Sequence, residues 1–230
     1  MEYKVDIVMC IDVTGSMSPF IGEVKKSALE FWPKLKKACE EAQKYVTDVR
    51  VKVIAFRDFE ADGNKAMTQS DFFEISDDSS SAAAAYKEFV TGLNAEGGGP
   101  EPENSLEALT LAMKSDWVQS GDKQRHVIVL FTDASAHKLE EANRSNPNYP
   151  KDMPTSIEGL VDLWNSTEAN SGEIKLKNSA KRMIMFAPDM DTWNQLYEAL
   201  PGAIHVASKA GAGVDGVTLD TVIGQIVGSI

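Results

Sequence analysis

The segment VDIVMCIDVTGSM, residues 5–17, carries an apolar run that breaks abruptly into a turn. Its first half, Val5–Ile11, has the almost continuous apolar character of a buried strand. The turn that follows holds one carboxylate and two hydroxyls, on Asp12, Thr14 and Ser16. These are hard oxygen donors of the kind that Mg²⁺ and Ca²⁺ prefer, and ligands bind at the carboxyl ends of strands in an open α/β sheet. The turn therefore predicts a divalent-metal site.

A structural alternative is that Thr14 and Ser16 only cap the helix that follows the turn. Ser18 followed by Pro19 already supplies a good N-cap and a good first helical residue. We therefore expect a helix from Pro19 to about Tyr45, and we favour the metal-binding role for the two hydroxyls.

Short apolar runs alternate with amphipathic segments along the whole chain. We expect strands at Val5–Ile11, Val49–Phe56, Asp71–Ile75, His126–Phe131, Arg182–Phe186 and Ala203–Val206. We expect helices at 19–45, 79–93, 102–117, 157–170, 191–200 and 219–227, the last one approached by Gly211, Gly213 and Gly216. This alternation predicts an α/β fold with a doubly wound, mostly parallel sheet and helices on both faces. The 230 residues are compatible with a single domain over residues 1–230.

Composition and charge exclude several classes of protein. The formal net charge of −12 disfavours binding to nucleic acid. No window approaches the roughly 18 consecutive apolar residues of a membrane span. The first residues lack the pattern of a secretory leader, and the two cysteines, Cys10 and Cys39, cannot form a disulfide framework. We therefore expect a cytoplasmic protein with no membrane or nucleic-acid partner.

A second carboxylate follows a later strand. Asp133 comes directly after His126–Phe131, just as Asp12 follows the first strand. Parallel strands end at the same edge of a sheet, so neighbouring strands would bring the two carboxylates into one crevice, where a divalent cation relieves their repulsion. The alternative for Asp133-Ala134-Ser135 is a helix cap.

A glycine-rich loop, residues 96–103, is the third segment that leaves the sheet and enters a helix. Its three successive glycines let the backbone approach another group closely. Glu101 and Glu103 could reach a metal directly or through water, or could complement the positive end of the helix that we expect to begin at Pro102. We weigh both roles equally for Glu101 and favour the helix-end role for Glu103.

With these residues in place, the whole chain resembles a von Willebrand factor type A domain. Asp12, Thr14 and Ser16 match the Asp-x-Ser/Thr-x-Ser signature of that family, and Asp133 matches the aspartate after a later strand. The resemblance implies a metal-ion-dependent adhesion site, usually holding Mg²⁺, with Mn²⁺ and Ca²⁺ as alternatives. It implies the ligand set Asp12, Thr14, Ser16, Glu101 and Asp133.

The second loop looks like the Gly-Gly-Gly-Asp-x-Pro-Glu loop of intracellular relatives but departs from it at one position. Pro100 stands where the acidic ligand would be and has no side-chain oxygen, so Glu101 or water would fill that position. Arg57-Asp58-Phe59 and His137 also look like rim segments of those relatives. We favour structural roles for both, and give His126 and His205 no function.

The resemblance implies a non-catalytic protein-binding module, in which an acidic side chain of a partner protein fills the open coordination position of the ion. The loop 143–154, with Tyr149, either selects the partner or is a passive insertion. One alternative is a Mg²⁺-dependent phosphatase or hydrolase of haloacid dehalogenase type, although Thr14 stands where that class has a second aspartate and no general acid is evident. Another is a scaffold that works without metal.

Overall fold

The computed structural model describes residues 3–75, 80–166, 175–208, 220, 223, 224, 227 and 228. Its centre is a sheet in the order β3-β2-β1-β5-β6-β7, with β4 also paired to β2. The parallel strands are β1 (Tyr3–Asp12), β2 (Val46–Phe56), β5 (Lys123–Phe131), β6 (Lys181–Pro188) and β7 (Ala203–Ser208). β3 (Met67–Gln69) and β4 (Phe73–Glu74) run antiparallel to β2. The predicted doubly wound, mostly parallel sheet is confirmed.

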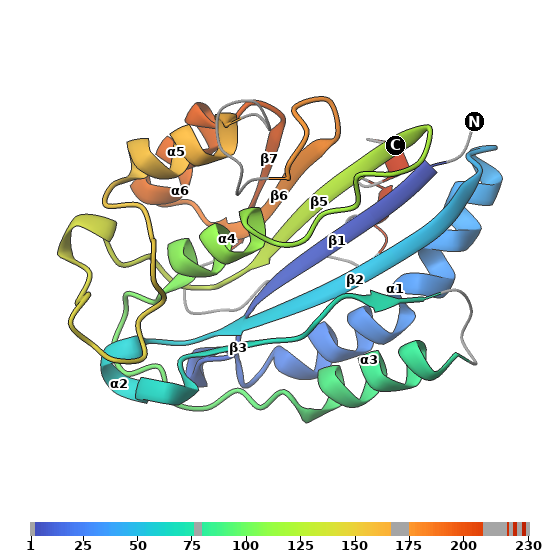
Figure 1. Cartoon of the computed structure of the whole chain (residues 1–230). Coiled ribbons are helices and arrows are strands. Elements are labelled where there is room, and N and C mark those ends of the chain that lie inside the picture. Colours follow the sequence, from blue (N-terminus) through green and yellow to red (C-terminus); the bar gives the residue numbers. More distant parts are fainter. Residues whose placement is uncertain are drawn as a thin grey trace.

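Helices cover both faces of the sheet (Figure 1). One face carries α1 (Ile21–Glu41) and α3 (Ser81–Gly92), and the other carries α4 (Ser105–Met113), α5 (Ile157–Asn165) and α6 (Asp191–Ala199). Alternate residues of β1 divide between the two cores: Ile7 and Met9 pack with the α1 and α3 side, and Val8 and Cys10 with the α4 side. This two-sided burial explains the almost unbroken apolar run of β1.

The strand order places a switch point beside β1. Its neighbours are β2 on one side and β5 on the other, so the strand order reverses its direction there. Asp12 pairs in register with Phe56, and Ile11 pairs with Phe131. Residues 12 and 133 therefore leave the sheet at the same edge, where ligands bind in folds of this kind.

The start of α1 differs from the prediction. The helix begins at Ile21 after a short 3₁₀ turn η1 (Gly15–Met17), and its N-cap residue, Phe20, makes no side-chain capping bond. The Ser18 hydroxyl instead donates to the carbonyl of Ala95 at 3.1 Å. The expectation of a Ser18–Pro19 cap is therefore wrong, because the Ser18 hydroxyl bonds to a distant loop and does not cap the helix.

Other boundaries also differ from the prediction: α1 ends at Glu41 and not near Tyr45, and β2 begins at Val46 and not at Val49. α4 begins at Ser105, three residues after Pro102, and ends at Met113, although Trp117 beyond it is buried as expected. β3 was not predicted. α5 ends at Asn165 with Ser166 as its extended C-cap residue, and residues 167–170 of the predicted helix lie outside the described residues. The three predicted linker glycines and most of the predicted final helix also lie outside them.

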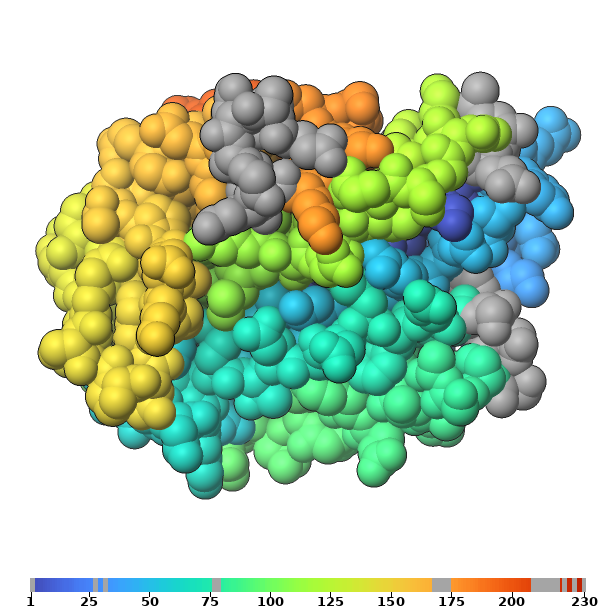
Figure 2. All heavy atoms as spheres, in the orientation of Figure 1, coloured from blue at the N-terminus to red at the C-terminus, as the bar shows by residue number. Residues whose placement is uncertain are grey.

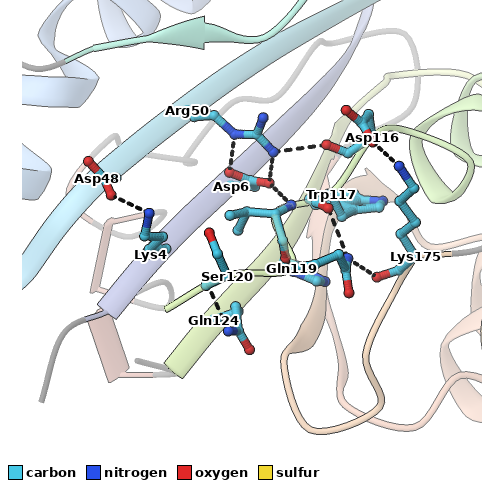
Figure 3. Close-up of polar contacts among 12 residues, drawn as sticks. Lys4, Asp6, Asp48, Arg50, Asp116, Trp117, Gln119, Ser120, Gln124 and Lys175 are labelled. Atoms are coloured by element: carbon cyan, nitrogen blue, oxygen red, sulfur yellow. Dashed lines mark hydrogen bonds and ion pairs between the residues drawn. The ribbon is translucent and has the colours of Figure 1, made fainter. Parts of the chain in front are cut away.

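The opposite edge of the sheet is closed by a polar network (Figure 3). Asp6, almost fully buried, accepts from Arg50 Nε at 2.8 Å and Nη2 at 2.6 Å, and from the Val118 amide at 2.6 Å. A cavity of about 410 Å³ lies beside this pair and beside a second pair, Lys4 and Asp48, 2.9 Å apart. These two ion pairs are satisfied within the protein, so we assign them a structural role.

The long segment after β5 packs against the short helix α2 (Phe59–Asp62), as Figure 2 shows for its yellow atoms beside the cyan ones. The Asn146 amide donates to the carbonyl of Phe59 at 3.0 Å, and the Tyr149 ring lies against Phe59. The Tyr149 hydroxyl donates to the buried Glu107 at 2.7 Å. The loop 143–154 is therefore a packed part of the domain beside the helix that follows β2.

Candidate functional site

A chain of hydrogen bonds joins the ends of β1 and β5. Asp12 Oδ1 accepts from the Thr14 hydroxyl at 2.6 Å and the Thr14 amide at 2.9 Å. The Thr14 and Ser16 hydroxyl oxygens lie 3.1 Å apart, and Ser16 Oγ donates to Asp133 Oδ1 at 3.0 Å. Four of the five predicted ligands thus meet, although Asp12 and Asp133 stand on different strands.

The other oxygen of Asp12 is also held. Asp12 Oδ2 accepts from the Thr132 hydroxyl at 2.7 Å, a contact that sequence reasoning did not anticipate. Burial raises the pKa of Asp12 to about 6, the nearby charge of Asp133 adds to the rise, and the bonds from Thr14 and Thr132 oppose it. A carboxylate in this position is electrostatically unfavourable by itself, so a cation would stabilise its charged form.

The helix-cap alternatives lose support at both positions. The hydroxyl of Thr14, the N-cap residue of η1, makes no capping bond and turns to Asp12 instead. No helix starts at Asp133: the first helical turn after it is η3 (Leu139–Glu141). Their polar side chains are therefore directed at one another across the sheet edge.

The glycine loop is threaded between these two ends. Its backbone is tied to the turn after β1 by Glu96 N to Val13 O and by Gly15 N to Gly97 O, each 3.0 Å. Gly98 has φ +92°, and a Cβ atom there would lie 2.6 Å from Thr14 Cβ and Cγ2. The predicted close backbone approach is thus real, and the group approached is Thr14.

The two glutamates of this loop occupy different environments. Glu101 is exposed, and its Oε2 accepts from the Ser135 amide at 3.3 Å and the Ser135 hydroxyl at 3.2 Å. Glu103 is only 3% exposed, and its Oε1 lies on the Gly98 side of the site, close to where a Gly98 Cβ would be. The geometry favours Glu103 over Glu101 as the acidic group of this loop.

Glu103 is the residue that sequence reasoning undervalued. α4 begins two residues later, at Ser105, so Glu103 stands before the helix and not in its first turn. Burial raises the pKa of Glu103 to about 9, and the charges of Asp12, Asp58, Asp62 and Asp133 add to the rise. Two backbone hydrogen bonds, from Glu103 N to Ser135 O and from His137 N to Glu103 O, join its loop to the loop after β5. They form a parallel bridge between distant loops, which the sequence pattern does not indicate.

The rim residues have structural contacts. The Arg57 guanidinium donates from Nε to the Val13 carbonyl at 3.1 Å and from Nη2 to the Asn94 carbonyl at 2.8 Å, which agrees with the structural role we favoured. Asp58 caps α2 by accepting from the Glu60 amide at 2.8 Å. His137 Nε2 lies 3.4 Å from Asp58 Oδ1. These contacts hold the loops around the site.

The chemistry of the donor set fits a divalent cation. Asp12 and Asp133 supply carboxylate oxygens, and Thr14 and Ser16 supply hydroxyl oxygens along the same hydrogen-bonded chain. Over the described part of the chain, no group of three or more His, Cys, Asp or Glu side chains is arranged to hold a metal, so hydroxyls would have to complete the set. The assignment of these residues and Glu101 as metal ligands stays a prediction.

Comparisons with known proteins agree with this architecture. The chain is 26% identical over 187 residues to the α-protein kinase vwkA of Dictyostelium discoideum, covering 79% of this chain and 27% of that protein. It therefore spans about a quarter of the length of this relative. No helix among the described residues is long and apolar enough to cross a membrane.

Two solved structures share the fold. The pilus adhesin SpaC of Lactobacillus rhamnosus GG matches with a TM-score of 0.56 at 13% identity, covering 97% of this chain and 30% of that one. A von Willebrand factor type A protein from Catenulispora acidiphila matches with a TM-score of 0.52 at 16% identity, covering 98% and 42%. The sequence profile of the von Willebrand factor A domain matches residues 6–147 of the 230. The chain belongs to the von Willebrand factor A domain family.

Proposed function

We propose that this domain is a non-catalytic protein-binding module that depends on a divalent cation. Members of its family are commonly protein-interaction or adhesion modules. The cation would be Mg²⁺, with Mn²⁺ and Ca²⁺ as alternatives, and Asp12, Thr14, Ser16 and Asp133 would hold it. The observation that carries the proposal is the hydrogen-bonded chain joining these four side chains.

The same arrangement supports a binding role at the surface. Asp12, Thr14 and Asp133 are buried, whereas Ser16 is exposed, so the donors line the floor of a site that opens at the sheet edge. A bound ion would supply a positive charge there, and an acidic side chain of a partner could complete its coordination. Two buried free cysteines, Cys10 and Cys39, are compatible with a cytoplasmic location, which we also propose.

A phosphatase or hydrolase of haloacid dehalogenase type is less well supported. Its nucleophile would be Asp12, but that side chain is fully buried and both of its oxygens accept hydrogen bonds from threonines. The second acidic position of that class is Thr14 here. A screen of phosphate esters with Mg²⁺ tests this alternative: robust turnover lost in Asp12→Asn would contradict a binding-only module.

The proposal is tested by capturing partners with the immobilised domain in the presence of Mg²⁺ and again with a chelator. We expect a partner that is released by chelation and is not retained by Asp12→Ala. Asp48→Ala is the control, because Asp48 is an exposed carboxylate at the opposite edge of the sheet. Capture that is equal with chelator, or equal in Asp12→Ala, would support the metal-independent scaffold instead.

A further inference from the structure

Glu103 has a buried carboxyl group that the protein itself satisfies only in part. Its Oε2 is buried and has no hydrogen-bond partner among the described residues. A buried polar atom without a partner is costly, and in native structures such an atom usually marks a functional group or a site for a bound water or ion. The orientation of Glu103 therefore needs a reason beyond the stability of the fold.

The cationic groups near Glu103 are engaged elsewhere. Arg57, the buried arginine of this edge, donates to two backbone carbonyls. Another buried glutamate nearby, Glu107, is satisfied at one oxygen by the Tyr149 hydroxyl, although its Oε2 also has no partner among the described residues. The carboxyl of Glu103 faces the acidic cluster of Asp12, Asp58, Asp62 and Asp133 instead.

The other candidate positions of the second loop are less well placed to act on an ion. Pro100 has no side-chain oxygen, and the carboxylate of Glu101 is held at the surface by Ser135. The backbone of Glu103, in contrast, is bonded to the segment that follows Asp133, and its side chain lies near Thr14 and Gly98. Glu103 is thus the acidic side chain of this loop that points into the site.

We infer that Glu103 acts on the bound cation through an ion-held water molecule, which would donate a hydrogen bond to its unpartnered Oε2. This inference rests on the proposed function. A water-mediated role agrees with the absence of a three-carboxylate metal cluster among the described residues. A bound cation would favour the ionised form of Glu103, and hydrogen bonds from ion-bound water to a carboxylate are charge-assisted and strong.

The inference gives Glu103 a role in ion selectivity. Mg²⁺ loses its water reluctantly and is usually held by one or two carboxylates with several waters retained, whereas Ca²⁺ takes six to eight oxygen ligands. Two direct carboxylates, two hydroxyls and an acceptor for retained water suit Mg²⁺. Removing the acceptor should therefore weaken Mg²⁺ more than Ca²⁺.

Calorimetric titration of the chelator-treated protein with Mg²⁺ and with Ca²⁺ tests this role. We expect Glu103→Gln to weaken Mg²⁺ by about tenfold and Ca²⁺ by less, by analogy with the loss of other outer-shell partners of metal ligands. Glu103→Leu removes the acceptor altogether, retains a buried side chain and should weaken Mg²⁺ at least as much. Asp48→Asn changes an exposed carboxylate at the opposite edge of the sheet and should leave both affinities within about twofold, because it lies away from the site.

Two results would overturn the inference in distinguishable ways. If Asp12→Asn abolishes binding but both Glu103 variants bind Mg²⁺ as the wild type does, Glu103 has no role while the proposed site stands. If the wild type binds neither cation, the proposed function fails and this inference fails with it. Circular dichroism of each variant establishes that it is folded, and the leucine variant decides the question should the glutamine variant not fold.

Discussion

Substituting Gly98 by alanine should damage both the stability of the domain and its site. The new Cβ would lie 2.6 Å from Thr14 Cβ and Cγ2 and 2.9 Å from Glu103 Oε1, far inside the usual carbon contact distance. Gly98 also has φ +92°, where an L-residue is strained. The strain contributes about 1–2 kcal/mol and the overpacking about 1–3 kcal/mol. We therefore expect Gly98→Ala to lower the free energy of unfolding by about 2–5 kcal/mol.

Urea denaturation followed by circular dichroism measures this change, with Gly22→Ala as the matched control. Gly22 lies in α1, and a Cβ there would meet nothing within 4 Å. We expect the control to be neutral or more stable by up to about 1 kcal/mol, because alanine is the better helix former. Equal stabilities of the two variants would refute the close approach of the glycine loop to Thr14. Cation affinity measured on the folded fraction should fall in Gly98→Ala alone.

Three further predictions concern buried polar groups that stabilise the domain. Asp6→Ala should lower the free energy of unfolding in urea by about 3–5 kcal/mol, because it leaves the half-buried Arg50 guanidinium and the Val118 amide without the Asp6 carboxylate. The exposed Asp48→Ala should change it by less than about 1 kcal/mol. Similar losses in the two variants would contradict the burial of Asp6. Burial lowers the pKa of His126 from 6.5 to about 4. The unfolded chain therefore binds the proton first, so the stability that His126 contributes is present above pH 6.5 and falls by about 3 kcal/mol as the pH drops to about 4. The difference in free energy of unfolding between the wild type and His126→Gln should therefore shrink as the pH is lowered from 7 to 4.5. A difference that stays constant would contradict a neutral imidazole in the folded protein. Tyr149→Phe should lower stability by about 1–3 kcal/mol, because it removes the hydrogen bond to Glu107, and an unchanged urea midpoint would show that the bond contributes nothing.

Local patterns predicted the central strands of the sheet well, because burial on both faces imposes an apolar run on β1, β5 and β6. The run in β1 and the one in β5 gave the strands whose ends carry Asp12 and Asp133. Parallel strands share an edge, so the meeting of the two carboxylates followed from topology without any contact being known. The short β3 carries no such signal, because it is a three-residue edge strand with exposed side chains.

Contacts between distant loops could not be predicted in the same way. The Ser18 hydroxyl looks like a helix cap in the sequence, but the loop carrying Ala95 competes for it and wins. The exchange of roles between Glu101 and Glu103 has a similar cause. Which of the two points inward is fixed by the bridge between Glu103 and Ala136, a pairing that no local propensity encodes.

The central claim is that Asp12 and Asp133 hold a single cation. Anomalous diffraction from crystals grown with Mn²⁺ locates such an ion directly. We predict one peak bonded to oxygens of Asp12, Thr14, Ser16 and Asp133, at roughly the 2.0–2.6 Å expected for oxygen ligands of hard divalent cations. The account would be contradicted if this edge of the sheet is folded and open to solvent in the crystal but shows no peak, or if Mn²⁺ is bound at another place on the molecule.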